Sequence, residues 1–169
     1  MMILVTGGSK CGKSSYAESL FEDYPHTKYY IATMQPFGAE AFAAIERHQK
    51  LRADKGFLTI EQYTDADRVT LRKPGAVLLE CMGNLLANEM FRDNGITDCA
   101  DKIINNILRL NQRTEMLVIV TNQVGSDGIR YEAGTSFYMK SLGQINAGLA
   151  EYADRVVECV YGIPVRIKG

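Results

Sequence analysis

Gly7-Gly8-Ser9-Lys10-Cys11-Gly12-Lys13-Ser14 is the stretch that decides the fold of this chain, because it matches the pattern G-x-x-x-x-G-K-[ST] of a phosphate-binding loop. Glycines in such a loop let backbone N–H groups point at phosphate oxygens, Lys13 supplies a mobile positive charge, and the Ser14 hydroxyl can ligate Mg²⁺. An apolar run at residues 2–5 precedes the loop, and residues 15–21 have a helical pattern. This order of strand, loop and helix predicts a nucleotide site rather than a glycine-rich turn that binds nothing.

Apolar, β-rich runs recur along the chain and alternate with segments of helical periodicity. The runs occupy residues 2–5, 29–32, 76–79, 116–120 and 156–160, with 56–63 and 164–167 as further candidates. This alternation predicts an α/β fold, with a mostly parallel sheet covered by helices on both faces. Two helical stripes are expected to face the core: Ala100, Ile103, Ile104, Ile107 and Leu108, then Tyr138, Leu142, Ile145, Leu149 and Tyr152. Residues 125–134 are expected to form the longest loop, a mobile flap beside the nucleotide.

Length and composition predict one domain, spanning residues 1–169. Nineteen basic and twenty acidic residues give a net charge of −1 without blocks of like charge, so no nucleic-acid partner is expected. No apolar run is long enough for a membrane span, and the first strand leaves no room for a signal peptide, so we expect a cytoplasmic protein. The four cysteines are widely scattered, which favours reduced thiols over a disulfide framework or a zinc site.

Polar residues at the ends of other apolar runs are expected to complete the nucleotide site. Glu80 directly follows the buried run at residues 76–79, where phosphate-loop proteins place the acidic residue of the Mg²⁺ shell. Its alternative role is to cap a helix that starts near Met82. Thr33 and Asn122 follow two further runs and would reach the same edge of the sheet. Asn122 would orient a phosphate or a water there, or simply occupy a turn.

A histidine stands in an unexpected place in residues 40–52, which we predict to be a helix. Ala43 and Glu46 fall on its exposed face, whereas His48 falls on the apolar stripe. Such a histidine is more often a core residue, but Arg52 lies one turn further along the same stripe. A permanent charge there is costly unless the stripe borders a cleft or binds an anion, and a cationic neighbour favours neutral imidazole. The pair therefore makes His48 a candidate nucleophile or base in chemistry on a phosphate ester.

These segments together resemble the bifunctional adenosylcobinamide kinase and adenosylcobinamide-phosphate guanylyltransferase family of cobalamin biosynthesis. The most distinctive shared pattern follows residues 31–33 and comprises Gln35, Glu40, Ile45, His48 and Arg52, then Thr59 and Glu61. The remaining matches follow in order along nearly the whole chain: residues 3–14, 78–81, Asn88, 120–122, 124–125, Gly143, Asn146, 153–154, 162–164 and 167–168.

The resemblance implies a RecA-like P-loop NTPase fold, assembly into a homotrimer and two linked reactions. ATP or GTP would phosphorylate the hydroxyl of the corrinoid adenosylcobinamide, and GMP would then pass from GTP to that phosphate with release of pyrophosphate. The position matching His48 carries GMP covalently in that family, which divides the transfer into two displacements at phosphorus. The residues implied are His48, Lys13 and Glu80 for catalysis, residues 7–14 with Thr33, Arg52, Glu61 and Glu80 for the nucleotide, and Ser14 with Glu80 for Mg²⁺.

Several positions depart from the family pattern: Lys10 and Cys11 replace Arg-Ser, Ala53 replaces Pro, Phe57 stands one place late for Trp, Gln123 replaces an acid, Tyr138-Met139 replaces Phe-Arg, and Ala147 replaces Gln. Gln123, Met139 and Ala147 are expected near the corrinoid or the nucleotide base. An alternative is therefore a kinase or nucleotidyltransferase of the same lineage that acts on another substrate. A third is a non-catalytic nucleotide-binding regulatory subunit, although the intact residues Lys13, Ser14, Glu80 and His48 argue against it.

Overall fold

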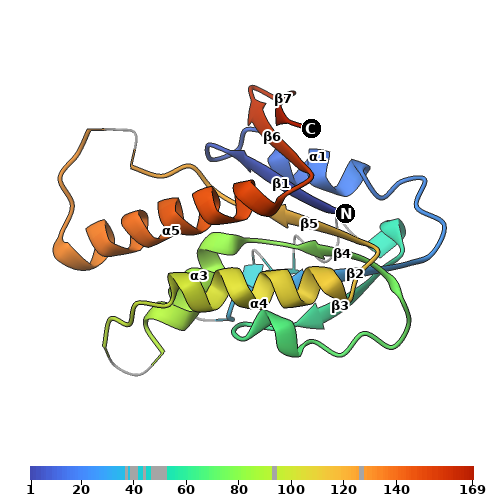
Figure 1. The fold of residues 1–169 in the computed structure, drawn as a ribbon, viewed down its shortest axis with the longest axis horizontal. Helices are drawn as coiled ribbons and strands as arrows, with labels where there is room; N and C mark the ends of the chain where they lie inside the picture. Colours follow the sequence, from blue (N-terminus) through green and yellow to red (C-terminus); the bar gives the residue numbers. More distant parts are fainter. Residues whose placement is uncertain (37, 39–41, 44, 47–52, 93–94, 126–127) are drawn as a thin grey trace.

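The computed structural model describes residues 1–36, 38, 42–43, 45–46, 53–92, 95–125 and 128–169. Within these residues, seven strands form one sheet in the order β3-β2-β4-β5-β1-β6-β7 (Figure 1). The strands are β1 (Met2–Gly7), β2 (Thr27–Ala32), β3 (Phe57–Glu61), β4 (Gly75–Leu79), β5 (Met116–Val120), β6 (Arg155–Val160) and β7 (Ile163–Lys168). All neighbouring pairs are parallel except β6 and β7, which form an antiparallel hairpin.

The central strands are apolar at successive positions because both faces of the sheet are covered. Every residue of β4 and of β5 is buried, as expected for inner strands of a parallel sheet. At one edge, β7 is exposed along its whole length. The continuous apolar runs of β4 and β5 therefore mark inner strands of the sheet, whereas the exposed β7 is an edge strand.

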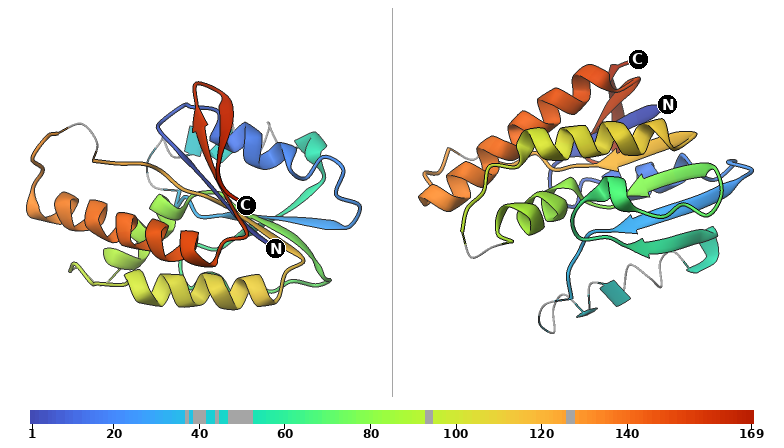
Figure 2. Two further views of the ribbon diagram at one scale, coloured as in Figure 1. Left: turned by 45° about the horizontal axis from the view of Figure 1, so that its top comes forward. Right: turned by 60° about the horizontal axis from the view of Figure 1, so that its bottom comes forward.

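Helices cover both faces of the sheet, as the alternating pattern predicts. The described helices are α1 (Lys13–Ser19), α3 (Met82–Met90), α4 (Ala100–Gln112) and α5 (Ala133–Tyr152), with short 3₁₀ turns η1 (Ala53–Lys55) and η2 (Ala66–Arg68). One core lies between the sheet and α3, α4 and α5, and a second lies between the opposite face and α1 (left view of Figure 2). Among the described residues, no helix is long and apolar enough to cross a membrane.

The structure confirms the expected strands and corrects three details of the helices. The first helix begins at Lys13 and ends at Ser19, rather than spanning residues 15–21. The loop predicted to reach Gly134 is shorter, because α5 begins at Ala133. Tyr152 does not face the core: it is the last residue of α5 and 61% exposed, and the buried stripe of the helix ends at Leu149. The other stripe residues are buried or packed against the core.

Parallel pairing brings the carboxyl ends of six strands to one edge of the sheet, which is where ligands of open α/β sheets bind. Register fixes which residues meet there: Ile31 pairs with Leu79, and Ala32 pairs with Glu61. Thr33 and Glu80 therefore leave the sheet side by side. The phosphate loop leaves the same edge at the end of β1.

Candidate functional site

The phosphate loop has the backbone geometry that its glycines predict. It connects β1 directly to α1, and φ is positive at Gly7 (148°), Lys10 (56°) and Gly12 (91°). A Cβ on Gly7 would lie 2.6 Å from the Sγ of Cys11 and 2.6 Å from the backbone O of Cys159, a separation that real structures do not tolerate. Only glycine fits this position, so the tight turn depends on it.

Hydrogen bonds from two other segments support the loop. The N–H of Gln123, just after β5, donates to the O of Gly7 at 3.2 Å, and the N–H of Gly162, in the β6–β7 turn, donates to the O of Cys11 at 3.0 Å. Both bonds use loop carbonyls. The loop N–H groups that the motif assigns to phosphate are not engaged by these bonds.

The lysine of the motif, Lys13, is held in place by a hydrogen bond within the loop. Lys13 is 9% exposed, and its Nζ donates a 2.7 Å hydrogen bond to the O of Gly8. A phosphate bound by the loop would meet an ammonium group whose place is set by the protein. Ser14 follows in the first turn of α1, where it is exposed.

Glu80 is fixed by its neighbour across the strands rather than used as a helix cap. Its Oε2 accepts a 3.1 Å hydrogen bond from the N–H of Thr33. The N-cap of α3 is Cys81, so the alternative in which Glu80 occupies that capping position is wrong. The Thr33 hydroxyl is buried and donates to the O of Cys81 at 3.0 Å. Thr33 thus aligns the ends of β2 and β4 and holds the carboxylate at the edge of the sheet.

Asn88 ties two of the strand ends together, a role that sequence reasoning missed. Its Nδ2 donates to the O of Thr33 at 2.8 Å and to the O of Tyr63 at 2.9 Å. One side chain on α3 therefore holds the residues that follow β2 and β3. The only signal in the sequence is that Asn88 is among the positions that match the family pattern.

A cavity of about 360 Å³ lies between these strand ends and the residues Phe42, Ile45 and Glu46. Three carboxylates line it, from Glu46, Glu61 and Glu80, and Met34 and Phe42 contribute apolar surface. We call it the acidic cavity. Glu61 accepts a 2.9 Å hydrogen bond from the Tyr63 hydroxyl, and burial, followed by the Glu61 carboxylate, raises the pKa of Tyr63. The structure thus brings Glu61 and Glu80, which are nineteen positions apart in the sequence, to one site.

Lys13 and Glu80 act on a common neighbour, the thiol of Cys81. Burial raises the pKa of Cys81, the Glu80 carboxylate raises it further, and the Lys13 ammonium lowers it. Both charges are therefore within electrostatic range of one thiol. Glu80 and the phosphate loop lie at the same edge of the sheet, and the role of Glu80 as the acidic partner of Ser14 stays a prediction.

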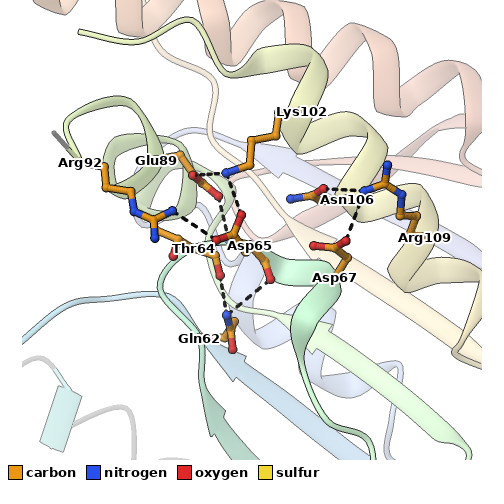
Figure 3. Close-up of polar contacts among 9 residues, drawn as sticks. All are labelled: Gln62, Thr64, Asp65, Asp67, Glu89, Arg92, Lys102, Asn106 and Arg109. Carbon is orange, nitrogen blue, oxygen red and sulfur yellow. Dashed lines mark hydrogen bonds and ion pairs between the residues drawn. The ribbon is translucent and has the colours of Figure 1, made fainter. Parts of the chain in front are cut away.

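A cluster of charged side chains supports the turn after β3 (Figure 3). Asp65 has a left-handed backbone (φ 49°), and its N–H donates to Oε1 of Glu89 at 2.7 Å. Lys102 bridges the two carboxylates, with its Nζ 2.7 Å from Asp65 and 2.8 Å from Glu89, and Arg92 reaches Asp65 at 3.2 Å. The turn that carries Tyr63 into the acidic cavity is thereby anchored to α3 and α4.

The predicted nucleophile His48 and its neighbour Arg52 lie outside the described residues. Of the predicted helix at residues 40–52, positions 42–43 and 45–46 are described and helical. Ala43 and Glu46 are exposed and Ile45 is half-buried, as its pattern predicts.

Among the described residues, no group of three or more His, Cys, Asp or Glu side chains could hold a metal ion alone. The Ser14 hydroxyl and the Glu80 carboxylate are oxygen donors of the kind Mg²⁺ takes, and Mg²⁺ usually completes its shell with waters and substrate phosphates.

Asn122 and its neighbours form part of the same edge. Its Nδ2 lies 3.8 Å from the Sγ of Cys81, and its backbone O accepts from Nδ2 of Asn146 at 3.2 Å. The Thr121 hydroxyl donates to Oδ1 of Asn146 at 2.7 Å. These contacts join the end of β5 to α3 and α5.

Comparison with known proteins agrees with this geometry. Residues 3–167 match the family described as cobinamide kinase / cobinamide phosphate guanyltransferase. The bifunctional adenosylcobalamin biosynthesis protein CobU of Salmonella typhimurium is 34% identical, over 99% of this chain and all of its own length. CobU of Escherichia coli is likewise 34% identical over 99% of this chain, and CobP of Pseudomonas aeruginosa is 27% identical over the whole chain. The chain therefore belongs to the cobinamide kinase / cobinamide phosphate guanyltransferase family.

Proposed function

We propose that this protein phosphorylates adenosylcobinamide with a nucleoside triphosphate and then transfers GMP from GTP to adenosylcobinamide phosphate. The observation that carries the proposal is the phosphate loop, with Lys13 held in place by Gly8, at the same edge of the sheet as Glu80 and the acidic cavity. Membership of the family adds the substrate class, because relatives that match over their whole length are named as bifunctional adenosylcobalamin biosynthesis proteins.

In the kinase reaction, the acceptor hydroxyl oxygen attacks the terminal phosphorus and the nucleoside diphosphate leaves. Lys13 and the loop N–H groups neutralise charge on the phosphate oxygens, which is the main catalytic need of phosphoryl transfer. Glu80 is suited to hold Mg²⁺ with Ser14 or to accept the proton of the hydroxyl. Mg²⁺, when bound, would add further positive charge at the phosphates.

In the guanylyl transfer, we assign the nucleophile to His48. Its imidazole nitrogen would attack the α-phosphorus of GTP, and the bond to pyrophosphate would break. A phosphate oxygen of adenosylcobinamide phosphate would then attack the same phosphorus and release the imidazole. Glu61 and Arg52 are proposed to bind the nucleotide, Glu61 in the acidic cavity and Arg52 at its phosphates.

Labelling with GTP that carries ³²P at its α-phosphate tests the guanylyl transfer. The wild type is expected to retain label that is lost in acid and survives in base, the behaviour of a phosphoramidate. His48→Ala should carry no label, whereas His26→Ala, the other histidine of the chain, should be labelled like the wild type. An unlabelled wild type, or a labelled His48→Ala, would show that the assignment of the nucleophile is wrong.

A second measurement tests the kinase reaction. Lys13→Ala should lower phosphorylation of adenosylcobinamide by about 10³-fold or more, because the loop loses its positive charge. Lys140→Ala is the control, because Lys140 is an exposed lysine of α5 that belongs neither to the phosphate loop nor to the lining of the acidic cavity. A Lys13→Ala variant with wild-type activity would contradict the role given to the loop.

We further propose that the protein assembles into a homotrimer and works in the cytoplasm. The support for assembly is β7, an edge strand on which Ile163, Val165 and Ile167 alternate and are 65%, 42% and 60% exposed. The support for the cytoplasm is that the four cysteines of the protein are free thiols, as expected in a reducing compartment. Light scattering should give three times the 18.8 kDa chain mass for the wild type, and a monomeric wild type would refute the trimer.

A further inference from the structure

Two adjoining hollows run along α5 on the side that faces the end of β5. Each has a volume of about 420 Å³, and both are lined by Gln123, Val124 and Met139, so they form one continuous groove. We call it the α5 groove. It reaches from Thr135 to Asn146, about 16 Å along the helix at 1.5 Å per residue. This length suits a ligand much larger than a phosphate or a sugar.

The α5 groove adjoins both parts of the phosphate-transfer site. Gln123, in its wall, donates its N–H to the O of Gly7, the first residue of the phosphate loop, at 3.2 Å. Asn122 lies against Cys81, which directly follows Glu80. A ligand in the groove could therefore extend one arm to the place where the terminal phosphate is bound.

The groove differs in charge from the acidic cavity on the other side of Glu80. None of its described lining residues is acidic or basic. Three carboxamides line it instead, from Asn122, Gln123 and Asn146, with the hydroxyl groups of Thr135 and Tyr138. Phosphate groups need cations or a loop of N–H donors, which this lining lacks, so it suits a neutral group rather than the phosphates of a nucleotide.

The lining offers hydrogen-bond acceptors beside apolar surface. The side-chain bonds of Asn122 and Gln123 use their nitrogens, and within the described part of the chain their side-chain oxygens have no partner. Val124 is 42% exposed beside them, and Met139 adds a flexible thioether. A ligand with amide N–H donors around an apolar ring would satisfy both features.

We propose that the α5 groove holds the corrinoid acceptor. This acceptor is a ring system whose periphery is uncharged and bears carboxamide side chains. The ring edge packs against Val124 and Met139, its side-chain amides donate to Asn122 and Gln123, and its hydroxyl arm reaches the phosphate loop. The nucleotide occupies the other side of Glu80. This inference rests on the proposed function and adds to it the place and the recognition of the acceptor.

Substitutions that fill or charge the groove test the proposal. Thr135→Trp adds bulk at an exposed lining position, and Met139→Asp puts a charge against the apolar wall. Glu151→Trp is the matched control, because Glu151 is an exposed residue of the same helix that does not line the groove. Binding of adenosylcobinamide is measured by equilibrium dialysis from its visible absorbance, and labelling from GTP alone reports whether the nucleotide site is intact.

The two groove variants are expected to raise the Kd for adenosylcobinamide at least about tenfold, with labelling from GTP within about twofold of the wild type. Glu151→Trp should match the wild type in both measurements. Groove variants that bind adenosylcobinamide as the wild type does would overturn the inference while leaving the proposed function intact. A wild type that is labelled by GTP but does not bind adenosylcobinamide would refute the proposed acceptor, and the assignment of the groove with it.

Discussion

Replacing Asn88 by alanine should lower the free energy of unfolding and raise the KM for GTP. The Nδ2 group of Asn88 makes two hydrogen bonds, of 2.8 and 2.9 Å, to the carbonyls of Thr33 and Tyr63. A buried carbonyl that loses its partner costs about 1–3 kcal/mol. Asn88 is only half-buried, so water can reach part of the gap, and we take the lower value for each bond. The free energy of unfolding should therefore fall by about 2 kcal/mol.

Urea unfolding followed by circular dichroism measures this loss. Asn105→Ala is the matched control: the side chain of Asn105 also donates to a carbonyl, that of Asp101 in the same helix, but it is exposed. Its cost should stay within about 0.5 kcal/mol. Asn88→Asp keeps the shape of the side chain but loses the NH₂ donor, so it should destabilise at least as much as Asn88→Ala.

The same change should also weaken nucleotide binding, because the ends of β2 and β3 carry Thr33 and Tyr63. Thr33 donates to Glu80, and Tyr63 donates to Glu61. We expect the KM for GTP to rise about fivefold in Asn88→Ala, equal to roughly 1 kcal/mol of lost positioning. The reasoning is refuted if Asn88→Ala and Asn88→Asp both keep wild-type stability and the wild-type KM.

Three further predictions follow from individual contacts. Gly7→Ala should lower the free energy of unfolding by about 2 kcal/mol or more, because its Cβ would lie 2.6 Å from the backbone O of Cys159. In the same urea titration, Gly8→Ala should change the free energy of unfolding little, because a Cβ at Gly8 has no neighbour within 4 Å. Tyr63→Phe should raise the KM for GTP about fivefold by removing the hydrogen bond to Glu61, and Tyr161→Phe, at a 95% exposed position, should not, as steady-state kinetics would show. The Lys102 hydrogen bond holds the pKa of Asp65 below its usual 3.8, so the stabilisation by this group is present above pH 3.8 and is lost as the pH falls through the lower, folded-state pKa. When unfolding is measured from pH 7 to pH 2, the free energy of unfolding should therefore fall less steeply in Asp65→Asn than in the wild type. Equal slopes in the two proteins would contradict this prediction.

The sequence was sufficient for the architecture because the signals involved are local. The phosphate loop is read from spacing alone, and inner strands such as β4 and β5 are continuous apolar runs. Even so, the pattern misplaced the start of α1, since the lysine of the motif already belongs to the helix. Tyr152 fits an apolar stripe but ends its helix, and periodicity does not tell where the covering sheet stops.

The supports of the site could not be predicted because their partners are distant in the chain. Asn88 contacts carbonyls 55 and 25 positions away, and Asp65 is neutralised by Lys102 of α4 and by Arg92, which follows α3. Because every residue has a backbone carbonyl, the residue types in the sequence do not indicate which carbonyl a side chain contacts. The α5 groove is a further case, because it is assembled from the end of one strand and a helix that begins after it.

The phosphate loop is conventionally read as a continuous motif, yet its last glycine has a partner at the far end of the chain. A Cβ on Gly12 would lie 3.1 Å from the Cα of Gly162, and the N–H of Gly162 holds the O of Cys11. The turn of the β6–β7 hairpin thus packs against the phosphate loop. Substitutions at positions 12 and 162 should not be independent, and removing the hairpin would alter the loop although every residue of the motif remained.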